Sequence, residues 1–303
     1  MKRVLLYGLI CLIFFPLATK AKSSSRYLLV GGSGNNQVSI IDKTTLKELW
    51  SYPLEAGTEC NSVDVTASGE ILIAYRGGAR LVNPENNTVV WDIKAPRTNE
   101  LSSALVLPGG GFLLAWSGHP AEIMELDDTG KIRKTIPFDT GIDHLHSQFR
   151  QVIKNRKGNY LIPLMGKGLL VEIDGNGKQL SSVEAGGNPF SALELKDGTI
   201  VVPCGDAHVV KQYRKGKEIR CLNQNDIEDI SLLFVAEVAM CRNGNLLICN
   251  WSGHEADKDQ PLVIELDAEN RPVWVLPSGR GIGSVSTVKE LTEKILKQKN
   301  ILH

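Results

Sequence analysis

The sequence lacks the markers of several common protein classes. It has no CxxC pair, so the usual ligand spacing of a structural zinc site is absent. It has no GxSxG segment, the nucleophile turn of the α/β hydrolases. Lysine plus arginine number 34 and aspartate plus glutamate number 34, so no net charge favours nucleic acid or an anionic membrane surface. Any chemistry must therefore come from the fold and from the placement of single residues.

A long apolar run is also missing. The longest, Val4–Ala18, falls short of the about 20 residues that a membrane-spanning helix needs. The basic segment Met1–Arg3 precedes this run, and the small residues Thr19 and Ala21 follow at the −3 and −1 positions of a signal-peptidase site. We therefore expect a signal peptide over residues 1–21, cleaved near Ala21. The remaining single domain, 22–303, would be exported to a bacterial periplasm or outside the cell, and an uncleaved anchor is the alternative.

Cysteines are few, and their number after the expected leader is odd. Five follow the expected leader: Cys60, Cys204, Cys221, Cys241 and Cys249. An odd count in an exported protein leaves at least one thiol without a partner. Cys241 and Cys249 fall on consecutive predicted strands and could form a disulfide, whereas small buried thiols on strands are the alternative.

The sequence does contain an internal repeat. An apolar strand recurs at intervals of 39 to 48 residues, near Tyr27, Ile71, Phe112, Tyr160, Thr199 and Leu246. Each copy continues with a polar turn and two further strands. The last of these carries tryptophan three times, at Trp50, Trp91 and Trp274. This period and this order of elements are typical of a four-stranded propeller blade.

The first copy lacks the strand that precedes each of the others. The segment Gly283–Val288 resembles Asn61–Thr66, which is the preceding strand of the second copy. A late strand that completes an early blade closes a ring and leaves no open sheet edge. We therefore predict an all-β, six-bladed β-propeller of four-stranded blades, closed by a C-terminal strand in the N-terminal blade. A short amphipathic helix is expected at about 289–302.

Three segments resemble a known repeat family. Val38–Leu54, Met124–Lys131 and Val263–Trp274 share a strand, an aspartate and a polar turn, and two of them continue to a tryptophan. The pattern resembles the PQQ-like β-propeller repeat over nearly the whole chain after the leader. Quinone-using members of that family are larger, eight-bladed enzymes with adjacent cysteines and a calcium site. This chain has no adjacent cysteine pair and six predicted blades. The resemblance therefore implies the fold, and we expect no PQQ and no other cofactor.

Histidines gather on one predicted face of the ring. In a propeller, the loops from strand two to strand three, and from strand four to the next blade, surround one mouth of the central channel. Five histidines map to these loops: His119, His144, His146, His208 and His254. Imidazole titrates near neutral pH and serves as base, metal ligand or hydrogen-bond donor. We therefore place a ligand site at this mouth, formed by Arg76, Glu100, Trp116, His119, His144, His146, Trp251, His254 and Arg280. Asp143, Gln148, Arg150 and Asp206 lie on the same face.

Two matched turns occur within this set. Trp116–His119 and Trp251–His254 both read WSGH and lie half a ring apart, in the third and sixth copies. They give the mouth two aromatic–imidazole walls for a sugar or an aromatic ligand, or they are a shared turn in which tryptophan packs between blades. The sequence leaves both interpretations open.

A metal site is a further alternative. His144 and His146 have the spacing that places two imidazoles on one side of a strand. A divalent metal would need a third ligand, for which Asp143, His119 and Glu100 are the candidates. No pattern in the sequence fixes that third ligand.

These observations favour an exported, monomeric binding or scaffold propeller. Its His/Trp-rich mouth would hold a small polar ligand, a glycan or a protein segment, with no nucleic-acid partner and no membrane span after leader cleavage. The main alternative is an enzyme that uses the same face: an arylsulfotransferase-like transferase, a lyase or a metal-assisted hydrolase. The chain is similar to the exported six-bladed arylsulfate sulfotransferases in architecture and residue type, which assigns no catalytic position.

Overall fold

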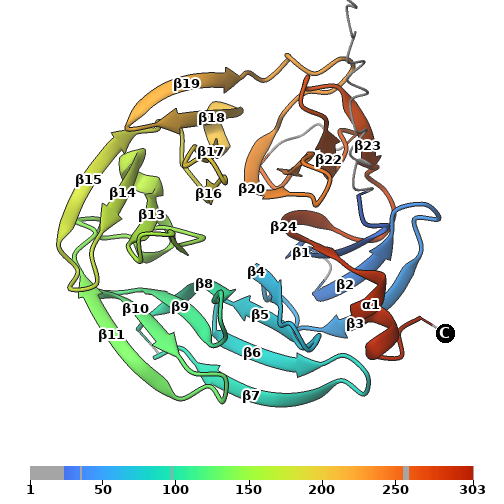
Figure 1. Cartoon of the computed structure of the whole chain (residues 1–303), viewed down its shortest axis with the longest axis horizontal. Coiled ribbons are helices and arrows are strands. Elements are labelled where there is room, and N and C mark those ends of the chain that lie inside the picture. Colours follow the sequence, from blue (N-terminus) through green and yellow to red (C-terminus); the bar gives the residue numbers. More distant parts are fainter. Residues whose placement is uncertain (1–23, 35, 97, 255–258, 303) are drawn as a thin grey trace, which may run out of the picture.

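The structure is a computed structural model that describes residues 24–34, 36–96, 98–254 and 259–302, so the expected signal peptide lies outside the described residues. Six four-stranded antiparallel sheets are arranged as blades around a central channel, as Figure 1 shows. This arrangement confirms the predicted six-bladed propeller. Within each blade the first strand lies next to the channel and the fourth strand lies on the rim.

From the channel outwards, each blade consists of four strands consecutive in the chain, except that the last strand of the chain takes the innermost place in blade 1. Blade 1 contains β24 (Ser284–Leu291), β1 (Tyr27–Ser33), β2 (Gln37–Asp42) and β3 (Glu48–Pro53), and blade 2 contains β4 (Cys60–Val65), β5 (Ile71–Tyr75), β6 (Gly78–Asn83) and β7 (Thr88–Lys94). Blade 3 contains β8 (Glu100–Val106), β9 (Phe112–Ser117), β10 (Ala121–Leu126) and β11 (Ile132–Phe138), and blade 4 contains β12 (Ile153–Lys154), β13 (Tyr160–Leu164), β14 (Leu169–Ile173) and β15 (Gln179–Glu184). Blade 5 contains β16 (Leu193–Glu194), β17 (Ile200–Cys204), β18 (Val209–Arg214) and β19 (Lys217–Leu222), and blade 6 contains β20 (Phe234–Met240), β21 (Leu246–Trp251), β22 (Val263–Leu266) and β23 (Pro272–Leu276). Three 3-10 turns, η1 (Leu145–Ser147), η2 (Met165–Lys167) and η3 (Gly205–Ala207), and the helix α1 (Glu293–Gln298) complete the described elements.

The core lies between successive blades. Second strands such as β5, β9 and β13 are buried along their whole length, because both of their faces pack against neighbouring blades. This explains why they read as continuous apolar runs in the sequence. The fourth strands β7 and β15 are mostly exposed, since they form the rim of the ring.

The ring closes as predicted. β24 pairs antiparallel with β1 from Tyr27↔Leu291 to Ser33↔Ser284. The strand is longer than expected, because residues 289–291 continue the ladder, and the helix is therefore confined to Glu293–Gln298. The Thr292 side chain caps this helix by accepting a hydrogen bond from the Ile295 amide.

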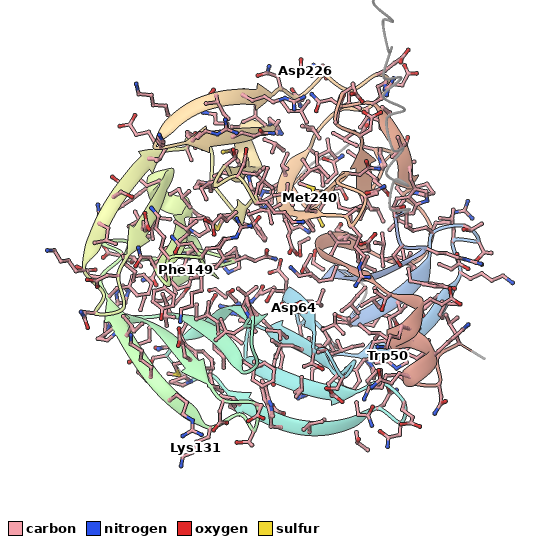
Figure 2. The ribbon with its side chains drawn as sticks, viewed as in Figure 1. Trp50, Asp64, Lys131, Phe149, Asp226 and Met240 are labelled. Carbon is pink, nitrogen blue, oxygen red and sulfur yellow. The ribbon has the colours of Figure 1, made fainter. Side chains whose placement is uncertain are left out.

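Tryptophans on the fourth strands connect one blade to the next near the rim, where Figure 2 labels Trp50. The Trp50 indole donates to Asn87 Oδ1 at 2.8 Å, in the β6–β7 turn of the following blade. Trp91 packs edge-on against Phe112 of the next blade, with ring centroids 5.0 Å apart. The Trp274 indole donates to the Lys43 carbonyl at 2.9 Å and so joins blade 6 to blade 1.

The described cysteines are all free thiols, and Cys60, Cys204, Cys241 and Cys249 are buried. The disulfide considered between Cys241 and Cys249 is therefore not formed: Cys249 is a small buried residue on β21, and Cys241 is buried directly after β20. Within the described ranges, no helix has the length and apolar character needed to cross a membrane.

Candidate functional site

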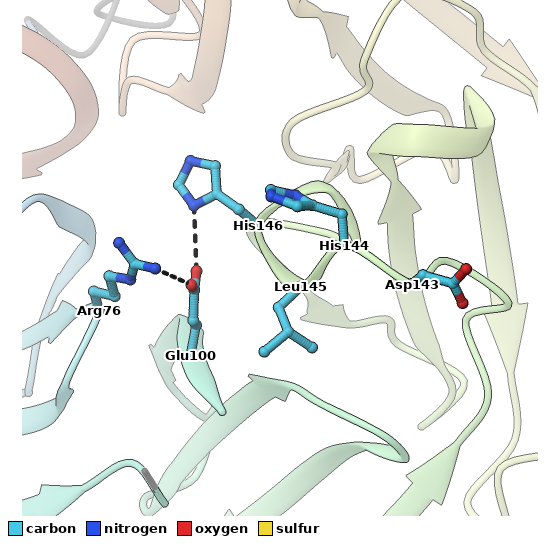
Figure 3. Close-up of a pocket in the computed structure, with 6 residues that line it drawn as sticks. All are labelled: Arg76, Glu100, Asp143, His144, Leu145 and His146. Atoms are coloured by element: carbon cyan, nitrogen blue, oxygen red, sulfur yellow. Dashed lines mark hydrogen bonds and ion pairs between the residues drawn. The ribbon is translucent and has the colours of Figure 1, made fainter. Parts of the chain in front are cut away.

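A cavity of ≈ 530 Å³ opens at the mouth where the histidine-bearing loops meet. Figure 3 shows its lining, which consists of Arg76, Glu100, Asp143, His144, Leu145 and His146. Arg76 follows β5 in blade 2, Glu100 begins β8 in blade 3, and the other four residues belong to the connection from β11 into blade 4. Three successive blades therefore build one site.

Glu100 is the centre of this site. Its carboxylate accepts a hydrogen bond from Arg76 Nη2 at 2.5 Å and contacts His146 Nδ1 at 3.2 Å (Figure 3). Burial acts to raise the pKa of Glu100, but the hydrogen bond from His146 and the charge of Arg76 outweigh it, so the pKa lies below its usual value. The carboxylate is therefore ionised at neutral pH and holds both side chains in place.

Arg150 determines which ring nitrogen of His146 carries the proton. Its guanidinium is buried, donates from Nη2 to His146 Nε2 at 2.7 Å, and donates from Nη1 to the His146 carbonyl at 2.6 Å. Because a guanidinium only donates, Nε2 must be the acceptor and Nδ1 carries the proton that faces Glu100. Burial, followed by the Arg150 charge, lowers the pKa of His146. The imidazole is thus neutral near pH 7.

A buried amide positions the loop that carries the histidines. Gln148 accepts from the Gly118 amide at 2.9 Å and donates to the carbonyls of Gly118, at 3.0 Å, and Ile142, at 2.9 Å. It therefore ties the first WSGH turn to the connection between blades 3 and 4. Gly118 itself is required there, because a Cβ would lie 2.8 Å from the backbone carbonyl oxygen of Pro120.

His144 is the more available imidazole. Its Nδ1 lies 3.1 Å from Ser147 Oγ, and its Nε2 has no protein partner among the described residues. The His144 and His146 rings are 6.4 Å apart and nearly perpendicular. The cavity thus combines two imidazoles, an arginine and an ionised carboxylate, which suits recognition of a polar ligand or transfer of a proton.

The first WSGH turn contributes no aromatic wall. Trp116 is 1% exposed and packs in the core between blades 2 and 3, with its indole nitrogen 3.2 Å from Met124 Sδ. His119 is exposed, and its Nε2 lies 3.0 Å from the Asp143 carbonyl. In this turn the tryptophan packs between blades, and the imidazole braces the neighbouring loop.

The second WSGH turn forms a separate cluster. Trp251 is half-buried, donates to Ser33 Oγ at 2.9 Å and lies edge-on to His254, with ring centroids 4.7 Å apart. His254 Nδ1 is 3.7 Å from Asp206 Oδ1. Arg280 is exposed in the connection from β23 to β24. The lining of the ≈ 530 Å³ cavity includes none of these side chains.

The other candidates are placed as follows. His208 ends η3 and its Nδ1 lies 2.9 Å from the Leu233 carbonyl.

For a metal, the described part of the chain contains no group of three or more His, Cys, Asp or Glu side chains that could hold an ion. Asp143 points away from the histidine pair in Figure 3. Both nitrogens of His146 already have protein partners.

Two positioning residues, Gln148 and Arg150, were outside the predicted site. The sequence placed both on this face but gave no reason to rank them with the ligand-contacting residues. Their signal is the polar run Gln148–Gln151, interrupted only by Phe149, just before the inner strand β12. Both side chains are buried rather than exposed to solvent, Gln148 against Gly118 of blade 3 and Arg150 against His146 of its own loop.

Together the fold and the cavity define a six-bladed β-propeller with a polar site at one channel mouth. The chain belongs to the Mal s 1 allergenic protein-like family, whose model matches residues 34–271. No curated protein matches the chain. Because the matching model is that of a different propeller family, the PQQ-like resemblance is not confirmed.

Solved structures show the same fold. A protein of unknown function from Bacteroides caccae is 43% identical over 88% of this chain and 98% of its own, with a TM-score of 0.84. The WD40 β-propeller domain of Doa1 is 18% identical, with coverage of 74% and 71% and a TM-score of 0.56. Virginiamycin B lyase from Staphylococcus aureus is 12% identical, with coverage of 81% and 78% and a TM-score of 0.55. The last two likenesses concern the fold alone.

Proposed function

We propose that this chain is an exported, monomeric binding propeller that holds a small polar ligand with an anionic group at the Arg76–His146 cavity. The proposal includes removal of the leader near Ala21 and binding without a resident cofactor. The observation that carries it is the state of Arg76. This side chain is 67% exposed, yet Glu100 fixes one edge of its guanidinium.

Arg76 has donors to spare. A guanidinium carries five N–H groups in a planar fork that matches carboxylate, sulfate and phosphate groups. Among the described residues, only Nη2 has a protein partner, Glu100. The remaining N–H groups are therefore available at the cavity, and the ion pair reduces the freedom that the side chain would lose on binding.

His144 supports the same proposal from the other side of the cavity. Its Nε2 has no protein partner in the described part of the chain, so it can donate to a ligand oxygen or accept from a hydroxyl. Leu145 adds an apolar contact next to it. A small acid or an acidic sugar would satisfy this combination of one cationic fork, one imidazole and one apolar surface.

The test is a ligand screen followed by a matched pair of variants. Carboxylic acids, sulfated and phosphorylated sugars and their neutral counterparts would be screened by thermal shift, and the hits would be measured by calorimetry. Arg76→Gln is expected to weaken binding of the anionic hits at least tenfold, since it removes the charge and the fork. Arg271→Gln, at an arginine that is exposed on the opposite face, serves as control. Equal affinities for wild type and Arg76→Gln would refute the proposal.

A lyase is the second candidate. It is favoured by the pairing of His146 with Glu100 and by the free Nε2 of His144, which could act as base beside a carboxylate-oriented imidazole. The fold shared with virginiamycin B lyase makes virginiamycin B a first probe. Its consumption, followed by mass spectrometry, should be lost in His144→Gln. If wild type consumes none, this probe gives the lyase hypothesis no support, and the binding hypothesis stands alone.

Export is tested separately. Expression with the whole sequence in a bacterial host should yield a mature protein in the periplasm or the medium. Its N-terminus, read by mass spectrometry, is expected at Lys22. Full-length protein retained in the cell or in the membrane fraction would contradict the proposed export.

A further inference from the structure

The fourth strand of each blade has one position that faces the next blade. In three blades this position holds tryptophan, which pairs across the sheet with the residue just before a β-bulge: Ile40↔Trp50, Leu81↔Trp91 and Glu265↔Trp274. In blade 4 the equivalent pair is Glu172↔Ser181. A serine therefore stands where three other blades place an indole.

Each of these indoles fills the space beside the third-to-fourth-strand turn of the following blade. Trp50 contacts Asn87 in such a turn, and Trp274 contacts Lys43 in another. The fit at Trp91 is tight, because a Cβ on Gly130 of the next turn would lie 3.0 Å from the indole. At the Trp91 interface the indole therefore occupies the space beside the turn, whereas a pocket of ≈ 470 Å³ remains next to Trp274 between blades 6 and 1.

The interface between blades 4 and 5 has a cavity at the corresponding place. It measures ≈ 500 Å³, and its lining includes Ser181 on β15 and residues 214–216 of the β18–β19 turn. Gly216 in this turn is the counterpart of Gly130, and a Cβ there would meet nothing within 4 Å. The space that Trp91 fills at its own interface is therefore open here.

The cavity has an apolar floor and a polar rim. Leu161 and Leu170 of blade 4 and Tyr213 of blade 5 are buried in its wall. Arg214 and Asp197 form an exposed ion pair at the edge. The floor suits the face of a flat ring, and the rim carries both charges.

We propose that this groove binds a small molecule carrying an indole-sized aromatic ring, which takes the place that the chain's own tryptophan occupies at three other interfaces. The groove is formed by turns of the face opposite the histidine-bearing mouth, so the proposal is independent of the Arg76–His146 cavity. The polar end of the ligand would lie at the rim, beside Arg214 and Asp197. An aromatic amine, an aromatic acid or an aromatic amino acid could each be accommodated there.

The experiment uses tryptophan, tryptamine, indole-3-acetate and unsubstituted indole as probes, with calorimetry on the full protein. Wild type is expected to bind at least one probe. The charge on the substituent of the best-bound probe will show whether Arg214 or Asp197 contacts the ligand. Ser181→Trp should fill the groove and weaken that binding at least tenfold. Ser181→Leu fills part of the space and should weaken it less, which keeps the test valid if the larger residue perturbs folding.

The matched control is Arg220→Trp. Arg220 holds the same register position in blade 5, opposite Gln212, and places an identical new indole on the neighbouring rim strand. Probe binding should be unchanged in this variant, and all variants should keep a cooperative thermal transition. No binding by wild type, or equal weakening in Ser181→Trp and Arg220→Trp, would overturn the proposal. Loss of anionic-ligand binding in Arg76→Gln, whether observed or not, would not bear on the proposed aromatic groove.

Discussion

His146 shows how a single side chain is held in one protonation state. Glu100 contacts its Nδ1, and Arg150 donates to its Nε2, so both ring nitrogens have partners of fixed role. The carboxylate favours the imidazolium, whereas burial and the guanidinium disfavour it, and the net effect lowers the pKa. The ring therefore enters the site as a neutral group whose orientation is set from two sides.

This balance predicts how stability depends on pH. The folded-state pKa of His146 lies below the unfolded value of about 6.5, so the unfolded chain binds the proton more tightly. The free energy of unfolding of the wild type should fall as the pH drops through about 6.5. The same drop in pH should lower the free energy of unfolding of His146→Gln by a smaller amount. Urea unfolding of both proteins at pH 7.5 and 5.5 measures the difference. An equal loss in both would contradict the lowered pKa.

The arginine can be tested by the same logic. Arg150→Gln removes the charge that helps to lower the His146 pKa, so the pKa should rise. An NMR titration of the His146 ring would follow the change. Arg156→Gln, at an exposed arginine in the β12–β13 turn, should leave the titration unchanged. An unshifted His146 pKa in Arg150→Gln would remove Arg150 as a positioning residue.

At the scale of elements, a largely buried ion pair at the C-terminal end of α1 holds the helix to blade 2. Lys299 Nζ donates to Glu70 Oε1 at 2.6 Å, and Leu296 on the same helix is fully buried. Burial acts to raise the pKa of Glu70, but hydrogen bonds from Lys299, Ser68 and Thr66 outweigh it and lower the pKa to about 2. The helix thus contributes to the propeller through a contact that requires an ionised carboxylate.

Acid should therefore weaken this contact. Because the folded pKa of Glu70 is about 2 and the ordinary value is 4.5, its stabilisation is present above pH 4.5 and is lost as the pH falls towards 2. Lys299→Met should lower the free energy of unfolding at pH 7 by on the order of 1 kcal/mol. It should also flatten the acid limb of stability against pH. Lys297→Met, at an exposed i,i+4 pair with Glu293, is the control and should change little. Matching acid limbs for Lys299→Met and wild type would show that the pair is not coupled to folding.

The elements were predictable where one repeat copy could be compared with another. Second strands are apolar along their whole length, and Asp or Gly marks the turns, so six copies point to the same blade. The inner strands β12 and β16 have only two residues each, because in those blades only part of the inner segment pairs with the second strand. Local pattern does not report on such pairing.

The site was less predictable for a related reason. Trp116 and Trp251 share the WSGH sequence, yet the first is fully buried and the second is half-buried. The two indoles also have different partners outside the turn, Met124 for Trp116 and Ser33 for Trp251. The histidines could be assigned to one face because each lies in a loop from strand two to strand three or from strand four to the next blade. The direction of each side chain, however, depends on contacts between blades. A single sequence does not encode those contacts in any local pattern.

At the scale of the whole molecule, polar side chains join blades across the channel. Gln151 of blade 4 donates to the Asn61 carbonyl of blade 2 at 3.3 Å and to Glu237 of blade 6 at 3.1 Å. Glu237 also accepts from Lys289 at 2.9 Å and from the Val288 amide at 2.9 Å. Three blades thus meet around one buried carboxylate, Gln151 extends the network to blade 2, and β24 is the strand that both closes the ring and reaches Glu237.

Closure should therefore control the stability of the entire ring rather than that of blade 1 alone. Val288→Pro removes an amide that donates to buried Glu237 and disturbs the β24–β1 ladder. It should lower the free energy of unfolding by at least about 2 kcal/mol, since an unsatisfied buried group costs about 1–3 kcal/mol and proline is poorly tolerated in an inner strand. Val90→Pro, at an exposed bulge position on the rim strand β7, should be tolerated by comparison. Chemical denaturation followed by circular dichroism and by hydrogen exchange would show whether all blades unfold in one transition. If Val288→Pro exposed only blade 1 to exchange and left the other five protected, the ring would not be the cooperative unit that its closure predicts.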